Sequence, residues 1–507
     1  MIYDTLLARS FSKHDQKKLG YGALAACFLV ALSFFTVCNP SLGPLPLLNL
    51  RLSKRGEQEV FGVNETSTLH MARDAEIITN NTLAISNASG SARSVNEIKV
   101  QGPLMVNATS SSQQLATDVV TKNEKMELLC NIKGRSEFCE IKGDIRIDGN
   151  SSTAFIVSSE TDILAAENTS WSIRPYARKE LVGIKDFARK WSVKLVPDHP
   201  DIAHCTRNHS VPAILFSVGG FSGNYFHAFT DIIVPLYATA RPFNGETQFL
   251  ITNNKSWWVA RFKTLLGALS KYEPIDIDDR HNIHCFKSLT IGLKGRTKKE
   301  LNIDPSTSPY SMKNFRQFLS RSYSLNTTTA AQIRDGNKRK PRLLIISRKR
   351  SRAFTNVGEI AKLAESLSYQ VVVAEPGPDV PGFAKIINSC DVVMGVHGAG
   401  LTNIVFLPEN AILIQVVPFG AGWSSRVCFE DPAKDMNIRY LDYKIGVEES
   451  TLTQQYPAGH VVLRDPSVIA KQGWLAFTSI YLHKQNVTLD VDRFRPTLVK
   501  ALELLHQ

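Results

Sequence analysis

The chain has 507 residues, of which 43% are apolar, and a formal net charge of +12. This length is enough for two or three domains with a sizeable buried core. A positive charge of this size is compatible with nucleic acid, a membrane surface or an anionic ligand. The sequence has no G-x-x-x-x-G-K-S/T, H-E-x-x-H or G-x-S-x-G pattern, which disfavours P-loop, zinc-protease and nucleophile-elbow chemistry.

The N-terminal region predicts a membrane anchor. Residues 19–38 carry no charge, and a helix of that length rises about 30 Å, enough to cross a bilayer core. Arg9, Lys13, Lys17 and Lys18 precede this stretch, so residues 1–18 are expected in the cytoplasm and the rest in the lumen. A cleaved signal peptide is the alternative, but the apolar stretch is long and no clear cleavage site follows it.

Residues 39–122 are predicted to form a flexible luminal stem, because they are rich in Ser, Asn, Thr and Gly and lack periodicity. Ten N-x-S/T patterns support luminal exposure. Six cysteines follow the anchor and allow fifteen pairings, of which Cys130–Cys139 is the simplest to expect. The candidate glycosylation sites are Asn64, Asn80, Asn87, Asn107, Asn150, Asn168, Asn208, Asn254, Asn326 and Asn486.

A first α/β unit is predicted within residues 123–337, with order beginning near Glu127. A hairpin is expected from strands 144–148 and 154–158, joined by a turn at Asp148-Gly149-Asn150. Further strands are expected at 213–218, 248–252 and 286–291, with a turn at Gly219-Gly220 and a helix from Tyr225 to Tyr237 that ends around Pro235. The polar stretch 326–341 suits an interdomain linker.

A second α/β unit is predicted within residues 338–507. Strands are expected at 342–347, 370–374, 392–396 and 411–417, with helices opening at Asn356, at Phe383 and after Gly400. Asn356 and Glu359 have capping-box spacing, which predicts a helix to about Leu367. Apolar strands that alternate with helices favour a parallel sheet covered on both faces, and two such units leave a cleft. The segment 492–506 is expected to be helical and to pack back across that cleft.

The most specific motif is Gly395-Val-His-Gly-Ala-Gly-Leu-Thr-Asn403, at the end of a predicted strand. The small residues Gly398, Ala399 and Gly400 allow backbone N–H groups at a helix start to approach an anion closely. His397 stands at the carboxyl end of the strand, where open α/β sheets bind ligands. This pattern predicts a diphosphate site, and a diphosphate site in the lumen suggests a nucleotide-sugar enzyme. An ordinary tight turn with a capping histidine is the alternative.

Other candidate residues belong to the same predicted cleft. Arg348 follows a strand directly and can pair with diphosphate oxygens, or else form a structural salt bridge. The basic run Arg348–Arg352 is expected to form a solvated face, with one or two residues reaching phosphate. Glu409 can accept hydrogen bonds from a ribose, or can be a surface carboxylate. Asp276-Ile-Asp278 matches a metal-binding pattern that recurs by chance, and no metal site is predicted there.

His227 and Asp231 lie four residues apart and therefore share one face of the predicted helix. An acidic group at a cleft can remove a proton from an acceptor hydroxyl while a diphosphate leaves. A helix-surface pair or a buried core histidine would have the same spacing.

In combination these segments resemble plant members of glycosyltransferase family 61, in particular the group that decorates xylan. The resemblance rests on Gly134–Cys139, Gly143–Arg146, Gly223–His227 with Asp231, Arg342–Arg348 and Val396–Asn403. It implies a single-pass type II Golgi membrane protein with a GT-B-like fold, in which two Rossmann-like domains face each other across a cleft.

The resemblance also implies a reaction. A pentose, arabinofuranose or xylose, would move from a UDP-sugar to the xylan backbone with inversion and without an obligatory metal or other cofactor. Arg348, His397, Gly398, Ala399, Gly400, Asn403 and Glu409 would hold the donor, with Asp231 as base and His227 beside it.

Nucleic acid is not expected as a partner, and a complex with other Golgi transferases is left open. The competing interpretations are N-glycan core β-1,2-xylosylation and a noncatalytic partner of other transferases.

Overall fold

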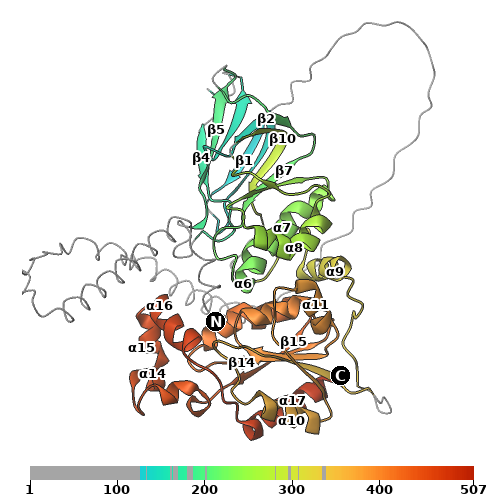
Figure 1. Cartoon of the computed structure of the whole chain (residues 1–507), viewed down its shortest axis with the longest axis vertical. Coiled ribbons are helices and arrows are strands. Elements are labelled where there is room, and N and C mark those ends of the chain that lie inside the picture. The colour runs from blue at the N-terminus through green and yellow to red at the C-terminus, as the bar shows by residue number, and fades with distance from the viewer. Residues whose placement is uncertain are drawn as a thin grey trace, which may run out of the picture. The chain divides into compact units, whose positions relative to one another are not determined.

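The computed structural model describes residues 126–506, with gaps at 133, 160–162, 164–168, 180–186, 200–201, 280, 295–298, 307 and 334–338. The predicted cytoplasmic tail, anchor and stem lie outside the described residues. None of the helices in the described part combines the length and apolar character needed to cross a membrane. The described chain forms a mixed α/β structure built on two sheets (Figure 1).

The first sheet has ten strands and contains both antiparallel and parallel pairs. The predicted hairpin is confirmed, since Asp148 pairs with Thr153 across its turn. β7, β8 and β9 extend the sheet in parallel, whereas β2 runs antiparallel to β10, so this half is not a purely parallel sheet. The strands are β1 (Glu127–Asn131), β2 (Phe138–Asp148), β3 (Thr153–Ser158), β4 (Ser170–Ile173), β5 (Trp191–Pro197), β6 (Arg207–Asn208), β7 (Ala213–Ser217), β8 (Gln248–Thr252), β9 (Ile275–Asp276) and β10 (Ile283–Gly292).

Two disulfides tie this half together. The predicted Cys130–Cys139 pair is confirmed, and it joins directly opposed positions of β1 and β2. A second disulfide links Cys205 to Cys285 in β10.

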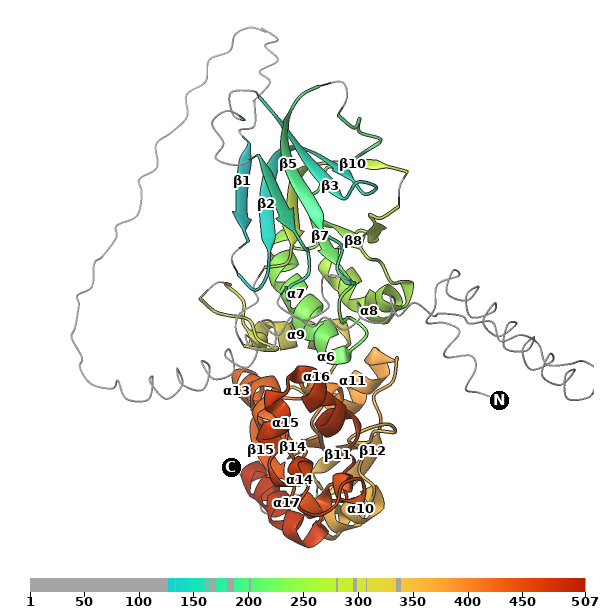
Figure 2. The same cartoon turned by 90° about the vertical axis from the view of Figure 1, so that its left-hand side faces the viewer.

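Helices lie against one end of the first sheet (Figure 2). The predicted helix from Tyr225 forms, but it does not end at Pro235. A wide π-helical turn precedes Pro235 and leaves room for its ring, so the helix runs on to Ala240. The elements are α6 (Tyr225–His227), η1 (Ala228–Ile233), α7 (Val234–Ala240), η2 (Arg241–Phe243), α8 (Ser256–Leu269) and α9 (Met312–Ser322).

The second sheet has five parallel strands in the order β12-β11-β13-β14-β15. Its strands are β11 (Arg342–Ile346), β12 (Gln370–Ala374), β13 (Val392–Val396), β14 (Ile412–Val417) and β15 (Arg439–Lys444). All four predicted strands are present, and β15 was not predicted. This order reverses direction between β11 and β13, which is the switch point where doubly wound sheets bind ligands.

The helices of the second half cover both faces of this sheet. α10 and α17 lie on one face and α11 on the other (Figure 1). The main elements are α10 (Val357–Ser366), α11 (Val380–Asn388), η3 (Ala399–Phe406), α12 (Gly422–Ser425), η4 (Arg426–Glu430), α13 (Asp431–Asp435) and α17 (Val491–Leu505). Between β15 and α17 come η5 (Val447–Glu449), η6 (Thr451–Gln454), α14 (Val461–Arg464), α15 (Pro466–Lys471), α16 (Trp474–Phe477) and η7 (Thr478–His483).

Two sequence predictions for this half are wrong in detail. The predicted capping box does not form, because the Asn356 side-chain oxygen Oδ1 accepts from the Leu489 backbone N–H instead of capping its own helix. The C-terminal helix α17 packs on β15 and α10 rather than across a cleft. Its apolar residues Phe494, Leu498 and Ala501 are buried there, so the sheet already covers its hydrophobic stripe.

One continuous hydrophobic core includes residues of both sheets, such as Phe216 of β7 and Leu344 of β11. Arg316 of α9 reinforces this contact, because its buried guanidinium donates to the backbone carbonyls of Leu407 and Met436. The described part of the predicted linker is also held. Thr327 and Ala331 donate backbone N–H groups to the buried side chains of Asn388 and Asp391. The two halves are therefore packed together and not merely tethered.

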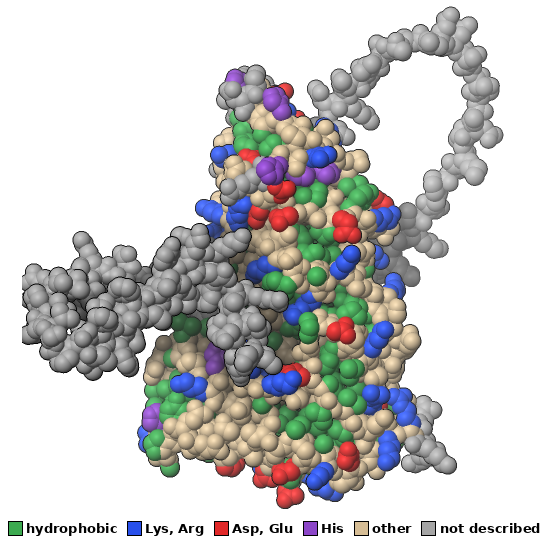
Figure 3. Space-filling model, in the orientation of Figure 1, with side chains coloured by type: hydrophobic (Ala, Val, Ile, Leu, Met, Phe, Trp, Pro, Cys, Tyr) green, Lys and Arg blue, Asp and Glu red, His purple; other side chains and the backbone are tan. Residues whose placement is uncertain are grey.

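Charges of both signs are mixed on the described surface seen in Figure 3. On the face drawn in Figure 3, the described Lys and Arg side chains are interspersed with Asp and Glu. Of the described candidate glycosylation sites, Asn150, Asn208, Asn254 and Asn326 are exposed. Asn486 is half-buried, and its side-chain oxygen accepts from the Ala353 backbone N–H.

Candidate active site

The helix that begins at Tyr225 carries a histidine–aspartate pair. His227 Nδ1 lies 2.8 Å from an Asp231 carboxylate oxygen, so the predicted shared face is confirmed. Because a carboxylate can only accept, Nδ1 of His227 carries the proton, and Nε2 of the neutral ring has a lone pair. The His227 side chain is 20% exposed, whereas that of Asp231 has no exposed surface. Only the histidine of this pair can meet a substrate directly.

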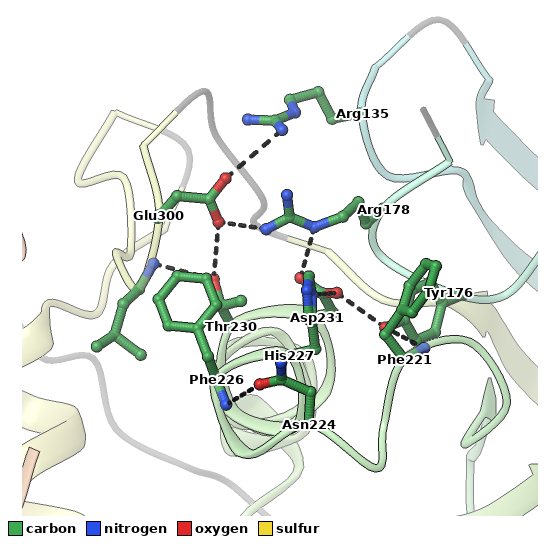
Figure 4. Close-up of polar contacts among 11 residues, drawn as sticks. Arg135, Tyr176, Arg178, Phe221, Asn224, Phe226, His227, Thr230, Asp231 and Glu300 are labelled. Atoms are coloured by element: carbon green, nitrogen blue, oxygen red, sulfur yellow. Dashed lines mark hydrogen bonds and ion pairs between the residues drawn. The ribbon is translucent and has the colours of Figure 1, made fainter. Parts of the chain in front are cut away.

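Asp231 is held from both sides. Arg178 Nε donates to one carboxylate oxygen at 2.9 Å, and the Tyr176 hydroxyl donates to the other at 2.8 Å. Arg178 also pairs with Glu300, which lies 3.7 Å from a guanidinium nitrogen of Arg135. Figure 4 shows Arg178 lying between Glu300 and Asp231. A buried carboxylate that is paired and fully hydrogen-bonded stays ionised, which suits a residue that orients a histidine.

These partners come from distant segments, and sequence reasoning missed them. Tyr176 and Arg178 follow β4, and Glu300 follows β10, so no local spacing relates them to the helix. Burial raises the pKa of the Tyr176 hydroxyl well above its usual value, so this group remains a donor. The Asp231 and Glu300 carboxylates likewise raise the pKa of Arg178 against the effect of its burial.

The second group of residues surrounds the loop after β13. Gly398 directly precedes η3 as its N-cap residue and has φ +150, a conformation essentially restricted to glycine. A Cβ at this position would lie 2.5 Å from Arg348 Nη1 and 3.0 Å from Arg352 Nη1. Two guanidinium groups therefore converge on the glycine, at the carboxyl ends of β11 and β13.

The two arginines form a cationic site. Burial lowers the pKa of Arg348, and burial together with the charge of Arg348 lowers the pKa of Arg352 to about 9. Within the described ranges no carboxylate lies at ion-pairing distance from either guanidinium, although the charge of Glu375 partly offsets the effect on Arg348. Two adjacent, partly desolvated cations favour an anionic ligand between them.

Arg352 was not predicted individually, and its position is fixed by the backbone. It adopts a left-handed conformation, φ +54, and its N–H donates to the buried Gln485 carbonyl at 2.7 Å. Its Nη1 donates to the His397 carbonyl at 3.0 Å. These two bonds fix the Arg352 guanidinium beside the loop that contains His397 and Gly398.

His397 is buried and has a defined tautomer. The Gln415 amide donates to His397 Nδ1 at 2.9 Å, while the Tyr440 hydroxyl donates to the Gln415 oxygen at 2.8 Å. Nδ1 is therefore an acceptor, and Nε2 carries the hydrogen. Burial and the two neighbouring arginines lower the pKa of His397 to about 3, so the ring is neutral at physiological pH.

Two other predicted donor residues lie elsewhere. The Asn403 side chain donates to the Gly400 carbonyl at 2.9 Å within η3, so its amide serves the loop. Glu409 precedes β14 and therefore lies at the amino ends of the parallel strands, whereas His397 lies at their carboxyl ends. The Glu409 carboxylate is 3.8 Å from Lys313 Nζ. A ribose contact from Glu409 is inconsistent with that position.

Aromatic rings connect the two groups. Phe429 of η4 contacts the His397 ring at 5.5 Å between centroids and the Phe226 ring at 5.7 Å. Phe226 directly precedes His227, and their rings lie 5.8 Å apart. The histidine–aspartate pair and the cationic loop thus belong to one boundary between the two halves. A cavity of about 460 Å³ lined by Lys299, Asp304 and Asp435 contains none of these residues.

The Asp276–Asp278 pattern has a structural role. Asp278 accepts from Arg189, from the Thr252 hydroxyl and from the Asn253 backbone N–H. Asn254 donates to Asp276. Among the described residues no cluster of three His, Cys, Asp or Glu side chains is placed to hold a metal ion.

The loop after β13 lies at the switch point of the parallel sheet and carries two arginines, and an oriented histidine lies at the same boundary. This arrangement suits an α/β protein that transfers a group from a phosphorylated donor. Residues 225–414 match the glycosyltransferase 61 family model. The match starts at the histidine–aspartate helix and ends in β14.

Comparison with curated proteins also finds similar glycosyltransferases. The chain is 43% identical over 389 residues to rice (Oryza sativa subsp. japonica) alpha-1,3-arabinosyltransferase XAT2, covering 75% of this chain and 65% of the relative. It is 41% identical over 397 residues to rice beta-1,2-xylosyltransferase XYXT1, covering 75% of this chain and 84% of that one. Xylan glycosyltransferase MUCI21 of Arabidopsis thaliana is 33% identical over 401 residues, covering 75% of this chain and 80% of that one.

The chain belongs to glycosyltransferase family 61, and it is a glycosyltransferase.

Proposed function

We propose that this protein transfers a pentose, arabinofuranose or xylose, from a UDP-sugar to the β-1,4-xylan backbone with inversion at the anomeric carbon. The observation that carries the proposal is the His227–Asp231 pair joined through Phe226 and Phe429 to the Arg348–Arg352 loop. The names of the similar proteins support the substrate class, because they include both arabinosyl- and xylosyltransferases. Both sugars are pentoses, so the proposed donor is a UDP-pentose.

The donor diphosphate would bind at the cationic loop. Arg348 and Arg352 converge there, so they can neutralise the charge that UDP gains as it leaves. His397 is fixed with Nε2 as a donor and can hydrogen-bond a phosphate or nucleoside oxygen without adding charge. Because two fixed cations are available, no obligatory metal is part of the proposal.

The acceptor hydroxyl would lose its proton to His227. This assignment changes the roles predicted from sequence, in which Asp231 was the base, because both Asp231 oxygens are already bonded and fully buried. In the reaction the acceptor oxygen attacks the anomeric carbon, and the proton passes to His227 Nε2. The bond between that carbon and the diphosphate oxygen breaks, and UDP leaves toward Arg348 and Arg352.

The proposed architecture is GT-B-like, with the first half on the acceptor side and the second half on the donor side. The enzyme would act in the Golgi lumen, held by the anchor expected at 19–38. Golgi membrane residence and N-glycosylation stay predictions, as does a complex with other Golgi transferases.

A donor and acceptor panel tests the proposal. A secreted 123–507 fragment would be incubated with UDP-arabinofuranose, UDP-xylose and UDP-N-acetylglucosamine, each with xylohexaose and with an N-glycan core. Transfer of one pentose to xylohexaose, with linkage analysis of the product, supports the proposal. Transfer to the N-glycan alone, or UDP binding without turnover for every pair, contradicts it in favour of the two competing interpretations.

A further inference from the structure

Phe187 is an exposed aromatic residue beside the proposed base. It is 53% exposed, and among the described phenylalanines no other is exposed by more than about a third. Its ring lies 6.0 Å from that of Phe221, whose ring lies 5.4 Å from that of His227. We propose that Phe187 and Phe221 form a stacking platform for the xylose units next to the one that receives the pentose. This inference rests on the proposed function.

The platform is tied to the active site through backbone contacts. The Gly220 N–H donates to the Phe187 carbonyl at 3.1 Å, and a Cβ at Gly219 would lie 1.9 Å from that carbonyl oxygen. Gly219 is therefore required for the close approach of the Phe187 segment to this turn, whereas a side chain at Gly220 would meet the Tyr176 ring.

A further bond links the platform to the histidine–aspartate pair. The Phe221 N–H donates to the Tyr176 hydroxyl at 3.3 Å, and this hydroxyl donates to Asp231. Figure 4 shows Phe221 and Tyr176 together on one side of Asp231. Because the same hydroxyl bonds both, the position of the platform is coupled to that of His227.

The chemistry of the platform fits an uncharged polysaccharide. The C–H bonds at C1 to C4 of a β-xylopyranose ring are axial, so both faces of the ring present weakly positive hydrogens to the negative face of an aromatic ring. A sugar ring stacked on the exposed Phe187 ring would remove apolar surface from water. The platform therefore fits the flat C–H faces of β-1,4-linked xylose units.

Acceptor-length kinetics test this inference. Initial rates would be measured with xylobiose and xylohexaose at saturating UDP-sugar for the wild type, Phe187→Ala and Phe187→Trp. We expect Phe187→Ala to raise KM for xylohexaose about tenfold, since stacking on one sugar is of the size of a single aromatic contact. Its KM for xylobiose and its affinity for UDP should stay within twofold of the wild type, and Phe187→Trp should restore the long-acceptor KM.

Tyr272→Ala serves as the matched control, because Tyr272 is also an exposed aromatic residue, at 37%. Its hydroxyl donates to Glu246, which is not part of the platform or of the active site. Unchanged xylohexaose KM in Phe187→Ala, or an equal rise in Tyr272→Ala, overturns the platform while leaving the proposed function intact. Absence of transfer to any xylo-oligosaccharide by the wild type is a different result. It removes the proposed function and the platform with it.

Discussion

His227 and His397 are held in opposite tautomers by their neighbours. The Asp231 carboxylate accepts from His227 Nδ1, and the Gln415 amide donates to His397 Nδ1. Nε2 therefore accepts in His227 and donates in His397. One ring suits the removal of a proton, and the other suits a hydrogen bond to an electron-rich donor substrate. This division of roles leads to the following predictions.

Asp231→Asn should lower kcat by about three orders of magnitude, because an amide at this position can favour the wrong His227 tautomer. UDP affinity should stay within twofold, since the cationic loop is on the other half. Arg178 retains Glu300, so the fold should persist. Single-turnover rates and calorimetric UDP binding check the two parts, and normal turnover would return His227 and Asp231 to a structural role.

Arg352→Ala should raise the Kd for UDP about 10- to 100-fold, the expected loss for one charge-assisted hydrogen bond. Arg350→Ala is the matched control, because Arg350 is an exposed residue of the same basic run. Isothermal titration with UDP compares the two. An equal effect of both substitutions would mean that the run acts only through its general charge.

Gly398→Ala should weaken UDP binding and destabilise the protein by about 1–3 kcal/mol, because φ +150 disfavours a side chain. The new methyl group would also displace the Arg348 guanidinium. Gly358→Ala, in α10 with open space around it, should be neutral or slightly stabilising. Thermal unfolding and UDP titration of both variants check this prediction. Wild-type stability and UDP affinity in Gly398→Ala would contradict the claim that Arg348 and Arg352 form a binding site at that glycine.

Acid should destabilise the folded protein through His397. Its folded pKa of about 3 lies below the unfolded value of about 6.5, so the unfolded chain binds the extra proton first as the pH falls. The stability that His397 contributes is present above about pH 6.5 and is lost progressively toward pH 3. Between pH 7 and pH 5 the loss is about 2 kcal/mol.

Denaturant unfolding of the wild type and of His397→Asn at pH 7 and pH 5 measures this term. The difference between the two pH values should be smaller in the variant. His284, with a pKa lowered to about 4 by burial and by His209, contributes in the same direction in both proteins.

Much of this structure could be predicted from local pattern. The strands from Arg342 to Val417 are short apolar runs between helices, and their order along the chain made a parallel sheet the natural expectation. The His227–Asp231 contact followed from helical spacing alone. The Cys130–Cys139 pair likewise joins residues close in sequence.

What could not be predicted depends on contacts between distant segments. Arg178 reaches Asp231, and Glu300 reaches Arg178, only because the mixed first sheet brings the segments after β4 and β10 together. Arg352 could not be distinguished from its neighbours in the basic run by sequence. Its position beside Gly398 depends on a backbone turn that the hydrogen bond from its N–H to the Gln485 carbonyl holds in place. The predicted ribose contact of Glu409 does not fit the structure, because Glu409 precedes a strand and His397 follows one. Strand direction, and not proximity in sequence to the glycine loop, decides at which end of a parallel sheet a residue lies.

The most direct test of the account is the rate of pentosyl transfer to xylohexaose by His227→Ala, measured with and without added imidazole. The His227 side chain is partly exposed, so a small base can enter the space that the substitution leaves. The account predicts almost no transfer by this variant alone and partial recovery with imidazole, whereas Asp231→Asn should not recover. Undiminished transfer by His227→Ala would contradict the assignment of this residue as the base.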